Sequence, residues 1–262
     1  MPVGLTLLIP PSLGHEQTAA LAATLADSLG RHLQLTIEVD VARTYEELEA
    51  RAIAGDAALI WAPPSVCARV HSAARMILKV VRSGHASYRA ALFCRADEPI
   101  DLEELSEDVR VAWVDPLSAA GYLLPRQHLR DLGLDPDMAM PNQRFFGSFG
   151  DAARAVVQGH ADLSSIFTHG DGDAVAAANL VVQVGDDASA LRVIAITEET
   201  ASDGLIIGAG LSDLVAGRLV ESLLADGDAG PDLVRGIFDA ETLMVAAPDD
   251  YEAIRTALAN ER

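Results

Sequence analysis

Cysteine, aromatic residues, basic residues and long hydrophobic runs are all scarce in this sequence. Its 262 residues include two cysteines, Cys67 and Cys94, which form neither a disulfide framework nor a CxxC motif, so two buried thiols are expected. No apolar run approaches the roughly 18 residues that span a bilayer, which argues against membrane insertion. The sequence also contains no HExxH, GxSxG or phosphate-binding-loop motif, so it indicates no metal, no cofactor and no catalytic residue.

The charge of the chain is strongly one-sided. Thirty-nine acidic residues against nineteen basic ones give a net charge of −20 at pH 7. This balance argues against nucleic acid and anionic membrane surfaces as partners. It also opposes long-range attraction of a small anion, so an anion site in this protein would have to rely on local backbone amides.

Short apolar strands alternate with helical patterns along most of the chain. This alternation predicts an α/β protein with a mainly parallel sheet, in which ligands gather at the carboxyl ends of strands. We expect strands at residues 3–9, 33–41, 56–61, 76–81, 88–94, 109–114, 142–146, 161–167, 191–197 and 205–208. Helices are expected at residues 16–29, 44–54, 65–74, 102–105, 118–132, 151–158, 211–225, 231–238 and 250–259.

The stretch from residue 109 to residue 133 is the strongest candidate for a binding site. It reads as a strand, a tight turn and a helix. Asp115-Pro116 ends the strand because proline brings no amide donor to a sheet, and Ser118 follows where a helix N-cap is expected. The free amides of Ala119 and Ala120, with the Ser118 hydroxyl, would suit an anion. A helix cap without a ligand is the alternative.

The residues of this turn also carry a family resemblance. Val-Asp-Pro-Leu-Ser-Ala-Ala-Gly-Tyr-Leu-Leu-Pro-Arg, at residues 114–126, resembles the signature of the phosphate/phosphite/phosphonate substrate-binding proteins of ABC transporters, the PhnD-like group. In that family the turn usually reads Asp-Pro-x-Ser-Thr-Ser-Gly-Tyr, and its hydroxyls hold the oxyanion. Here Ala119 and Ala120 replace the threonine and the second serine. The backbone amides survive this change, but two side-chain donors do not.

The resemblance implies a type II periplasmic-binding-protein fold, with two α/β lobes of mixed, mainly parallel sheets. Lobe one would comprise residues 1–84 and 196–262, and lobe two residues 85–195, with a two-strand hinge near residues 88–94 and 191–197. The lobes would close on a small oxyanion, phosphonate-like by family, with the Ser118 turn as the clamp.

Further candidate ligand contacts follow from the same resemblance and from the strand ends. In Gly147-Ser148-Phe149-Gly150, Ser148 corresponds to a family serine, while Phe149 replaces a histidine that often contacts the ligand. Tyr88 resembles a hinge tyrosine of the family. The other candidates are Trp61 and Ser12, which lie at strand ends, and Asp203, which could bind an ammonium group. Each of these residues also has a purely structural interpretation.

Alternatives remain open for the role of the chain. No basic segment or cleavage site is seen around residues 3–9, so the protein is expected to be cytoplasmic as written, or periplasmic if a leader has been removed. Its partner is then an ABC permease or, for a sensor domain, a signalling protein. A cytosolic enzyme of the same fold that acts on a small carboxylate, as in menaquinone biosynthesis, is the alternative from another class. Asp203, Asp115 and His15 are its candidate acids and bases.

Overall fold

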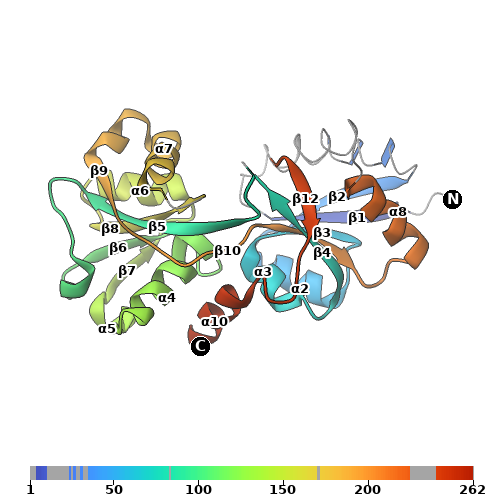
Figure 1. The fold of residues 1–262 in the computed structure, drawn as a ribbon, viewed down its shortest axis with the longest axis horizontal. Coiled ribbons are helices and arrows are strands. Elements are labelled where there is room, and N and C mark those ends of the chain that lie inside the picture. The colour runs from blue at the N-terminus through green and yellow to red at the C-terminus, as the bar shows by residue number, and fades with distance from the viewer. Residues whose placement is uncertain are drawn as a thin grey trace. The chain divides into compact units, whose positions relative to one another are not determined.

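The structure is a computed structural model that describes residues 4–10, 24, 26–27, 30–31, 35–82, 84–169, 172–224 and 240–261. The chain forms two compact units (Figure 1). Unit 1 comprises residues 1–86 and 201–251, and unit 2 comprises residues 87–200 and 252–262. The chain therefore passes between the units three times. Of the helices in the described ranges, none is long and apolar enough to cross a membrane.

Unit 1 is built on a six-stranded sheet with the strand order β12-β4-β11-β3-β1-β2. β1 pairs in parallel with β2 and β3, whereas β11 pairs antiparallel with β3 and β4, and β12 antiparallel with β4. The strands are β1 (Gly4–Ile9), β2 (Thr36–Val41), β3 (Leu59–Ala62), β4 (Ala74–Val81), β11 (Gly204–Gly208) and β12 (Thr242–Val245).

The helices of unit 1 begin where local sequence signals predict them. α2 (Tyr45–Ala54) is capped by Thr44, whose side chain accepts a hydrogen bond from the Glu47 amide at 3.1 Å. α3 (Pro64–Val70) follows the two prolines after β3, and α8 (Asp213–Leu224) packs its apolar face on the sheet. The core beneath α8 is aliphatic and contains Leu7, Leu59, Leu78, Leu205 and Leu219.

Unit 2 is built on a second six-stranded sheet, in which β10-β5-β8-β6-β7 is the main order and β9 also pairs with β5. β6 pairs in parallel with β7 and β8, whereas β5 pairs antiparallel with β8 and β9. The strands are β5 (Ser87–Arg95), β6 (Arg110–Trp113), β7 (Asn142–Phe145), β8 (Leu163–Thr168), β9 (Leu191–Ile196) and β10 (Thr200–Ala201).

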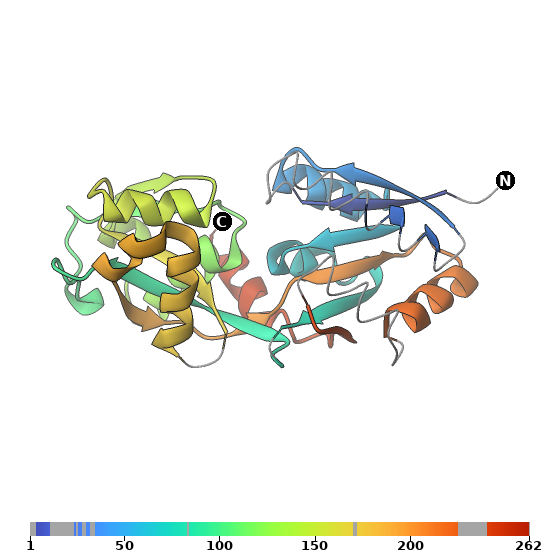
Figure 2. The same cartoon turned by 90° about the horizontal axis from the view of Figure 1, so that it is seen from above.

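Helices cover both faces of the unit 2 sheet. In Figure 1, α4 and α5 lie on one side of the strands and α6 and α7 on the other; Figure 2 shows α6 and α7 side by side. Two separate hydrophobic clusters fill these layers, one around Phe93 and Ile166 and one around Trp113 and Leu163. The helices are η1 (Leu102–Glu104), η2 (Ala119–Leu123), α4 (Leu124–Asp131), α5 (Pro136–Ala139), α6 (Phe149–Val157), α7 (Asp173–Val184), η3 (Gly185–Ala190) and α10 (Glu252–Asn260).

The predicted α/β class and two mixed sheets are found, but parallel pairing is confined to part of each sheet. Strand–helix units give the parallel pairs, while strands that return late in the chain, β9, β11 and β12, run antiparallel to their neighbours. The C-terminal helix also differs from the expected boundary. Residues 196–262 were expected in lobe one, whereas α10 belongs to unit 2, where it packs on η2 and α4.

Three helices and two short strands are not predicted from the sequence. No element is expected where α5, α7 and η3 lie, and none where β10 and β12 lie. α7 lacks the polar outer face that identifies an amphipathic helix, because its exposed positions are alanines and valines such as Val181 and Val182. The predicted helices at residues 16–29 and 231–238 fall largely or wholly outside the described residues.

Candidate ligand-binding site

The end of β6 brings two turns together at one edge of the unit 2 sheet. Trp113 is fully buried, and Val114 just beyond it is nearly so. The chain after β7 continues the pairing, because the Phe146 amide donates to the Trp113 carbonyl at 2.8 Å and the Gly147 amide to the Val114 carbonyl at 2.9 Å. The turn that leads to Ser118 and the turn that holds Ser148 therefore lie beside each other.

The Ser118 turn is held by its own side chains, as the sequence predicts. The Asp115 carboxylate accepts a hydrogen bond from the Leu117 amide at 2.8 Å, and the Asp115 carbonyl accepts from the Ser118 amide at 2.9 Å. Ser118 is the N-cap of η2, and its hydroxyl oxygen accepts from the Gly121 amide at 3.1 Å. Asp115 thus serves the turn itself, which leaves it little freedom to act as a general acid or base.

Glycine is required at position 121 by close packing. A Cβ atom there would lie 2.5 Å from Cγ2 of Val114 and 2.7 Å from Oγ of Ser118. The same close approach lets the Val114 amide donate to the Gly121 carbonyl at 3.1 Å. A side chain at this position would push the start of η2 away from the strand.

The backbone amides of Ala119 and Ala120 are the free donors of this turn. Neither donates a hydrogen bond to another of the described residues, although Ala119 is 3% and Ala120 2% exposed. The first amides of a helix have no partner within the helix and carry its positive dipole end. The Ala120 carbonyl is fixed from below by the Ser165 hydroxyl at 2.8 Å. The geometry is that of a small, preorganised anion-binding turn.

The Ser148 turn differs from the Ser118 turn in its charge. Ser148 is the N-cap of α6, and its hydroxyl oxygen accepts a hydrogen bond from the Asp151 amide at 3.1 Å. Its hydroxyl also donates to the Asp151 carboxylate at 2.6 Å, and the carboxylate pairs with Arg154 at 2.6 Å. This hydrogen bond and the arginine lower the pKa of Asp151. A carboxylate therefore already occupies the amino end of α6.

Tyr88 and Phe149 lie among aromatic side chains of unit 2. The Phe149 ring packs edge-on against Phe167, with ring centroids 5.4 Å apart, and Phe167 lies 6.2 Å from the His169 ring. Tyr88, on β5, lies 6.3 Å from His169 by the same measure. Phe149 and Phe167 also pack against the core beneath α6 and α7, which supports a structural role for both.

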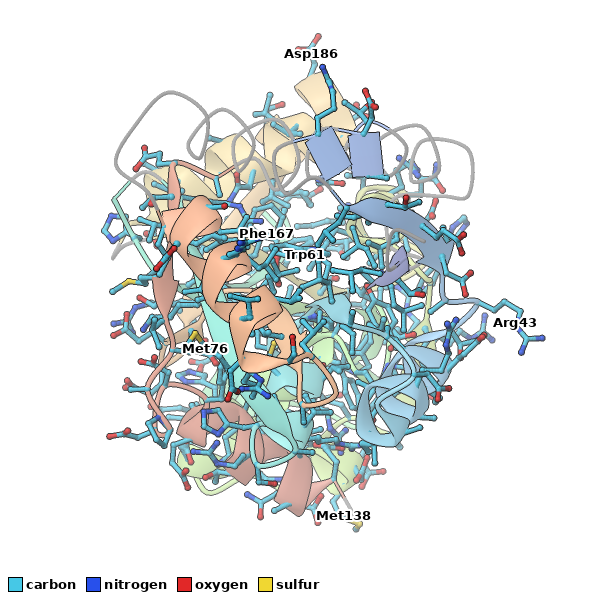
Figure 3. All side chains as sticks on the ribbon, turned by 90° about the vertical axis from the view of Figure 1, so that its right-hand side faces the viewer. Arg43, Trp61, Met76, Met138, Phe167 and Asp186 are labelled. Carbon is cyan, nitrogen blue, oxygen red and sulfur yellow. The ribbon has the colours of Figure 1, made fainter. Side chains whose placement is uncertain are left out.

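The other candidate residues lie in unit 1. Trp61 packs against the core beneath α8 (Figure 3). Asp203 forms an ion pair with Arg82 at 3.4 Å, so its carboxylate already has a cationic partner. Ser12 lies outside the described residues, as does His15.

Both cysteines are buried, as the sequence predicts. Burial raises the pKa of the Cys67 thiol well above its usual range, and its sulfur contacts the Ala62 carbonyl at 3.5 Å. A thiol in this environment is unreactive. Among the described residues there is also no cluster of histidine, cysteine or carboxylate side chains that could hold a metal ion.

A buried ionic network behind the Ser118 turn was not predicted. Arg126, which is 1% exposed, donates to Glu261 at 2.8 Å and to Gln143 and Asp137 at 2.9 Å each. The Tyr122 hydroxyl donates to the other Glu261 oxygen at 2.9 Å, and the Arg126 guanidinium lies over the Tyr122 ring. Burial, together with the hydrogen bond to Glu261, raises the pKa of Tyr122 to about 12. Because Tyr122 and Arg126 are one helical turn apart, the sequence could have indicated the contact between these two side chains. Their shared contact with Glu261 could not have been inferred from the sequence.

Two hollows on the surface of unit 2 lie away from the Ser118 turn. One, of about 290 Å³, is lined by Arg95, which ends β5, and by Val109 and Asp162, which precede β6 and β8 at the opposite edge of the sheet. The other, of about 550 Å³, runs beside β9 and includes His128 and Arg192. Neither contains a residue of the turn.

The comparisons with known proteins agree with the fold. Residues 7–260 match the family described as "ABC transporter, phosphonate, periplasmic substrate-binding protein". A search of curated proteins finds no match. Among solved structures, the chain is similar to a binding protein component of an ABC phosphonate transporter from Pseudomonas aeruginosa, with a TM-score of 0.78, 16% identity and coverage of 100% of this chain and 87% of that one.

Two further solved structures are similar over nearly their whole length. The PhnD1 protein from Prochlorococcus marinus, in complex with methylphosphonate, has a TM-score of 0.77 and 16% identity, with 98% of each chain covered. A Xanthomonas citri protein bound to chloride ion has a TM-score of 0.76 and 18% identity, covering 98% of this chain and 96% of that one. At these identities the likeness shows the type II periplasmic-binding-protein fold. The family match extends over nearly the whole chain, and the protein belongs to the periplasmic substrate-binding proteins of ABC phosphonate transporters.

Proposed function

We propose that this protein binds a small phosphonate-like oxyanion at the Ser118 turn and supplies it to an ABC permease. The observation that carries the proposal is the pair of buried amides of Ala119 and Ala120 at the start of η2, which have no hydrogen-bond acceptor among the described residues. Two amides and a serine hydroxyl can donate to the oxygens of one oxyanion without any cationic side chain. Such local donors suit a protein whose net charge of −20 repels anions at long range.

The family supports this proposal over an enzyme. Its members are substrate-binding proteins, not enzymes. The three candidate acids and bases also fit an enzyme poorly, because Asp115 caps its own turn, Asp203 pairs with Arg82, and His15 lies outside the described residues. The solved protein from Prochlorococcus marinus was crystallised with methylphosphonate, which makes that anion the first probe to test.

A ligand screen tests the proposed function directly. A ligand that binds only the folded protein raises its melting temperature by mass action, by an amount that grows with concentration. We expect a rise with methylphosphonate, phosphite or phosphate, and a smaller one or none with acetate and other simple carboxylates. Isothermal titration calorimetry then gives the affinity. If none of the phosphorus oxyanions binds, the ligand assignment is wrong, although the fold and the family stand.

The resemblance further implies that the two lobes close on the bound ligand. A decrease in the radius of gyration on adding the bound anion, measured by small-angle X-ray scattering, would support this expectation. An unchanged radius at a saturating concentration would contradict it.

A further inference from the structure

Three fully buried hydroxyl side chains lie on strand β8, and two of them have hydrogen-bond partners in the described part of the chain. The Ser164 hydroxyl donates to the Ala112 carbonyl at 2.7 Å, and the Ser165 hydroxyl donates to the Ala120 carbonyl at 2.8 Å. Thr168 is 0% exposed, and its Oγ1 has no hydrogen-bond partner among the described residues. A buried hydroxyl without a partner is costly, so native proteins keep few of them and usually for a reason.

The position of Thr168 indicates what that reason is. Thr168 is the last residue of β8, which runs parallel to β6 with Ser164 opposite Ala112. β6 ends at Trp113 and leads into the turn that holds Ser118, whereas β8 continues to Thr168. Because the carboxyl ends of parallel strands share one edge of a sheet, the unpartnered hydroxyl lies at the edge where the free amides of η2 lie.

β8 is also tied directly to the binding turn. Ser165 lies three residues before Thr168 on β8, and its hydroxyl donates a hydrogen bond to the Ala120 carbonyl of η2. Thr168 itself is part of the sheet, because it pairs with Arg89 of the antiparallel strand β5. The hydroxyl is therefore carried by a rigid strand whose spacing from η2 is fixed. Two other buried hydroxyls, Thr200 and Ser202, also lack partners among the described residues, but they lie near the passage between the units and not on this edge.

We infer that Thr168 is a ligand-binding residue whose hydroxyl donates to an oxygen of the oxyanion bound at the Ser118 turn. This inference rests on the proposed function and adds a donor from a second element. A hydroxyl supplies one donor, and a phosphonate or phosphite oxygen is an acceptor. The donor set is then two amides and two hydroxyls, from Ser118 and Thr168. Thr168 supplies from the neighbouring strand a hydroxyl of the kind that Ala119 and Ala120 cannot provide.

The test removes the hydroxyl and keeps the shape of the side chain. Thr168→Val is expected to weaken binding of methylphosphonate, phosphite or phosphate, whichever the wild-type protein binds, by about tenfold to a hundredfold. The melting temperature of the unliganded protein is expected to stay the same or rise, because the substitution removes an unpaired buried donor. Thr168→Ser keeps the donor and should bind much more tightly than Thr168→Val.

The matched control is Ser164→Ala, on the same strand. Ser164 is as buried as Thr168 but already donates to a carbonyl, so its loss should lower the melting temperature of the unliganded protein and leave the affinity unchanged.

Three results would overturn the inference. If Thr168→Val binds the anion as the wild type does, the hydroxyl does not contact the ligand, and only the inference about Thr168 fails. If Thr168→Val lowers the melting temperature of the unliganded protein as much as Ser164→Ala does, the hydroxyl has a structural partner. If the wild-type protein binds none of the three anions, the proposed function fails and the role of Thr168 falls with it.

Discussion

The two serine-capped turns of unit 2 look alike in sequence and differ in what they leave free. Both follow a parallel strand, and in both a serine hydroxyl accepts a hydrogen bond from the amide three residues on. At the Ser148 turn, the Asp151 carboxylate sits against that serine and is neutralised by Arg154. At the Ser118 turn, the Asp115 carboxylate instead accepts a hydrogen bond from the Leu117 amide, and no described residue accepts one from the amides of Ala119 and Ala120.

The support behind the two turns differs as well. The helix that follows Ser118 is anchored by Arg126, which is buried and shared among three acceptors from three other segments. The helix that follows Ser148 carries an ion pair whose two side chains are 50% and 51% exposed. This contrast is why we propose the Ser118 turn, and not the Ser148 turn, as the anion site. Four experiments test it.

The largest effect is expected from the buried arginine. Arg126→Met keeps the apolar stem but removes the buried guanidinium that Glu261 and Asp137 share, so that Glu261 keeps only Arg130 as a cationic partner. Breaking a buried ion pair costs up to about 3–5 kcal/mol. The matched variant is Arg154→Met, which breaks an exposed pair that contributes about 0–1 kcal/mol. Urea denaturation measures both. Equal losses in the two variants would show that the network does not distinguish the turns.

The two glycines near the serines should respond in opposite ways. Gly121→Ala places a Cβ atom 2.5 Å from Val114, and overpacking of this kind costs about 1–3 kcal/mol. At Gly150 the nearest atoms to a new Cβ are the mobile ends of Arg154 and Gln183, both at 3.3 Å. Gly150→Ala lies in a helix, where alanine is favoured over glycine by up to about 1 kcal/mol, so its melting temperature should hold or rise. A stable Gly121→Ala variant would contradict the packing described for η2.

The serines themselves should be alike in stability and different in binding. Loss of either cap, by Ser118→Ala or Ser148→Ala, is expected to cost about 1 kcal/mol of unfolding free energy. Only Ser118→Ala should also weaken anion binding, by about tenfold or more, because its hydroxyl is in the proposed site. Calorimetric titration of both variants with the anion that the wild type binds provides the measurement. If both variants weakened anion binding equally, Ser148 would also belong to the binding site.

The smallest effect is expected from acid. Burial opposes ionisation of Glu261, but hydrogen bonds from Arg126, Arg130 and Tyr122 outweigh it and lower its pKa. Its contribution to stability is therefore present above the unfolded value of about 4.3 and is lost as the pH falls through the lower folded value. Glu261→Gln should therefore flatten the decline of the melting temperature between about pH 5 and about pH 3, a range that brackets the unfolded pKa of about 4.3.

Asp151→Asn is the control for this titration. The pKa of Asp151 is lowered too, by Ser148 and Arg154, but the side chain is half exposed and its interactions are screened by solvent. Asp151→Asn should therefore change the dependence of the melting temperature on pH less than Glu261→Gln does. A larger change in Asp151→Asn would mean that the exposed pair supports its helix more than the buried network supports η2.

Local signals account for what the sequence could predict. Proline after Asp115 and the serine at 118 predict a helix start through short-range hydrogen bonding, and the structure confirms this cap. The turn that holds Ser148 also leads into a helix, which Ser148 caps. The prediction of both candidate turns needed only their own residues. Of the other proposed contacts, Tyr88, Trp61 and Asp203 have neighbours in the fold that explain them structurally, and their contact with a ligand stays a prediction.

Long-range contacts account for what the sequence could not predict. Tyr122 and Glu261 are 139 residues apart, so nothing near either residue indicates their hydrogen bond or the place of α10 in unit 2. The sequence also cannot show that the Thr168 hydroxyl has no partner among the residues that the structure describes, because this depends on which carbonyls the neighbouring strands present. α7 escaped prediction because its apolar outer face gives no periodic signal.

The α/β class, the family signature and the Ser118 turn can be read from the residues alone, since each depends on positions close together in the chain. Which serine turn keeps its amides available, which arginine anchors the helix after it and which hydroxyl on β8 has no partner in the described part of the chain all follow from the fold. The partners of buried polar groups come from segments that are distant in the chain, so a local sequence pattern cannot indicate which groups will pair.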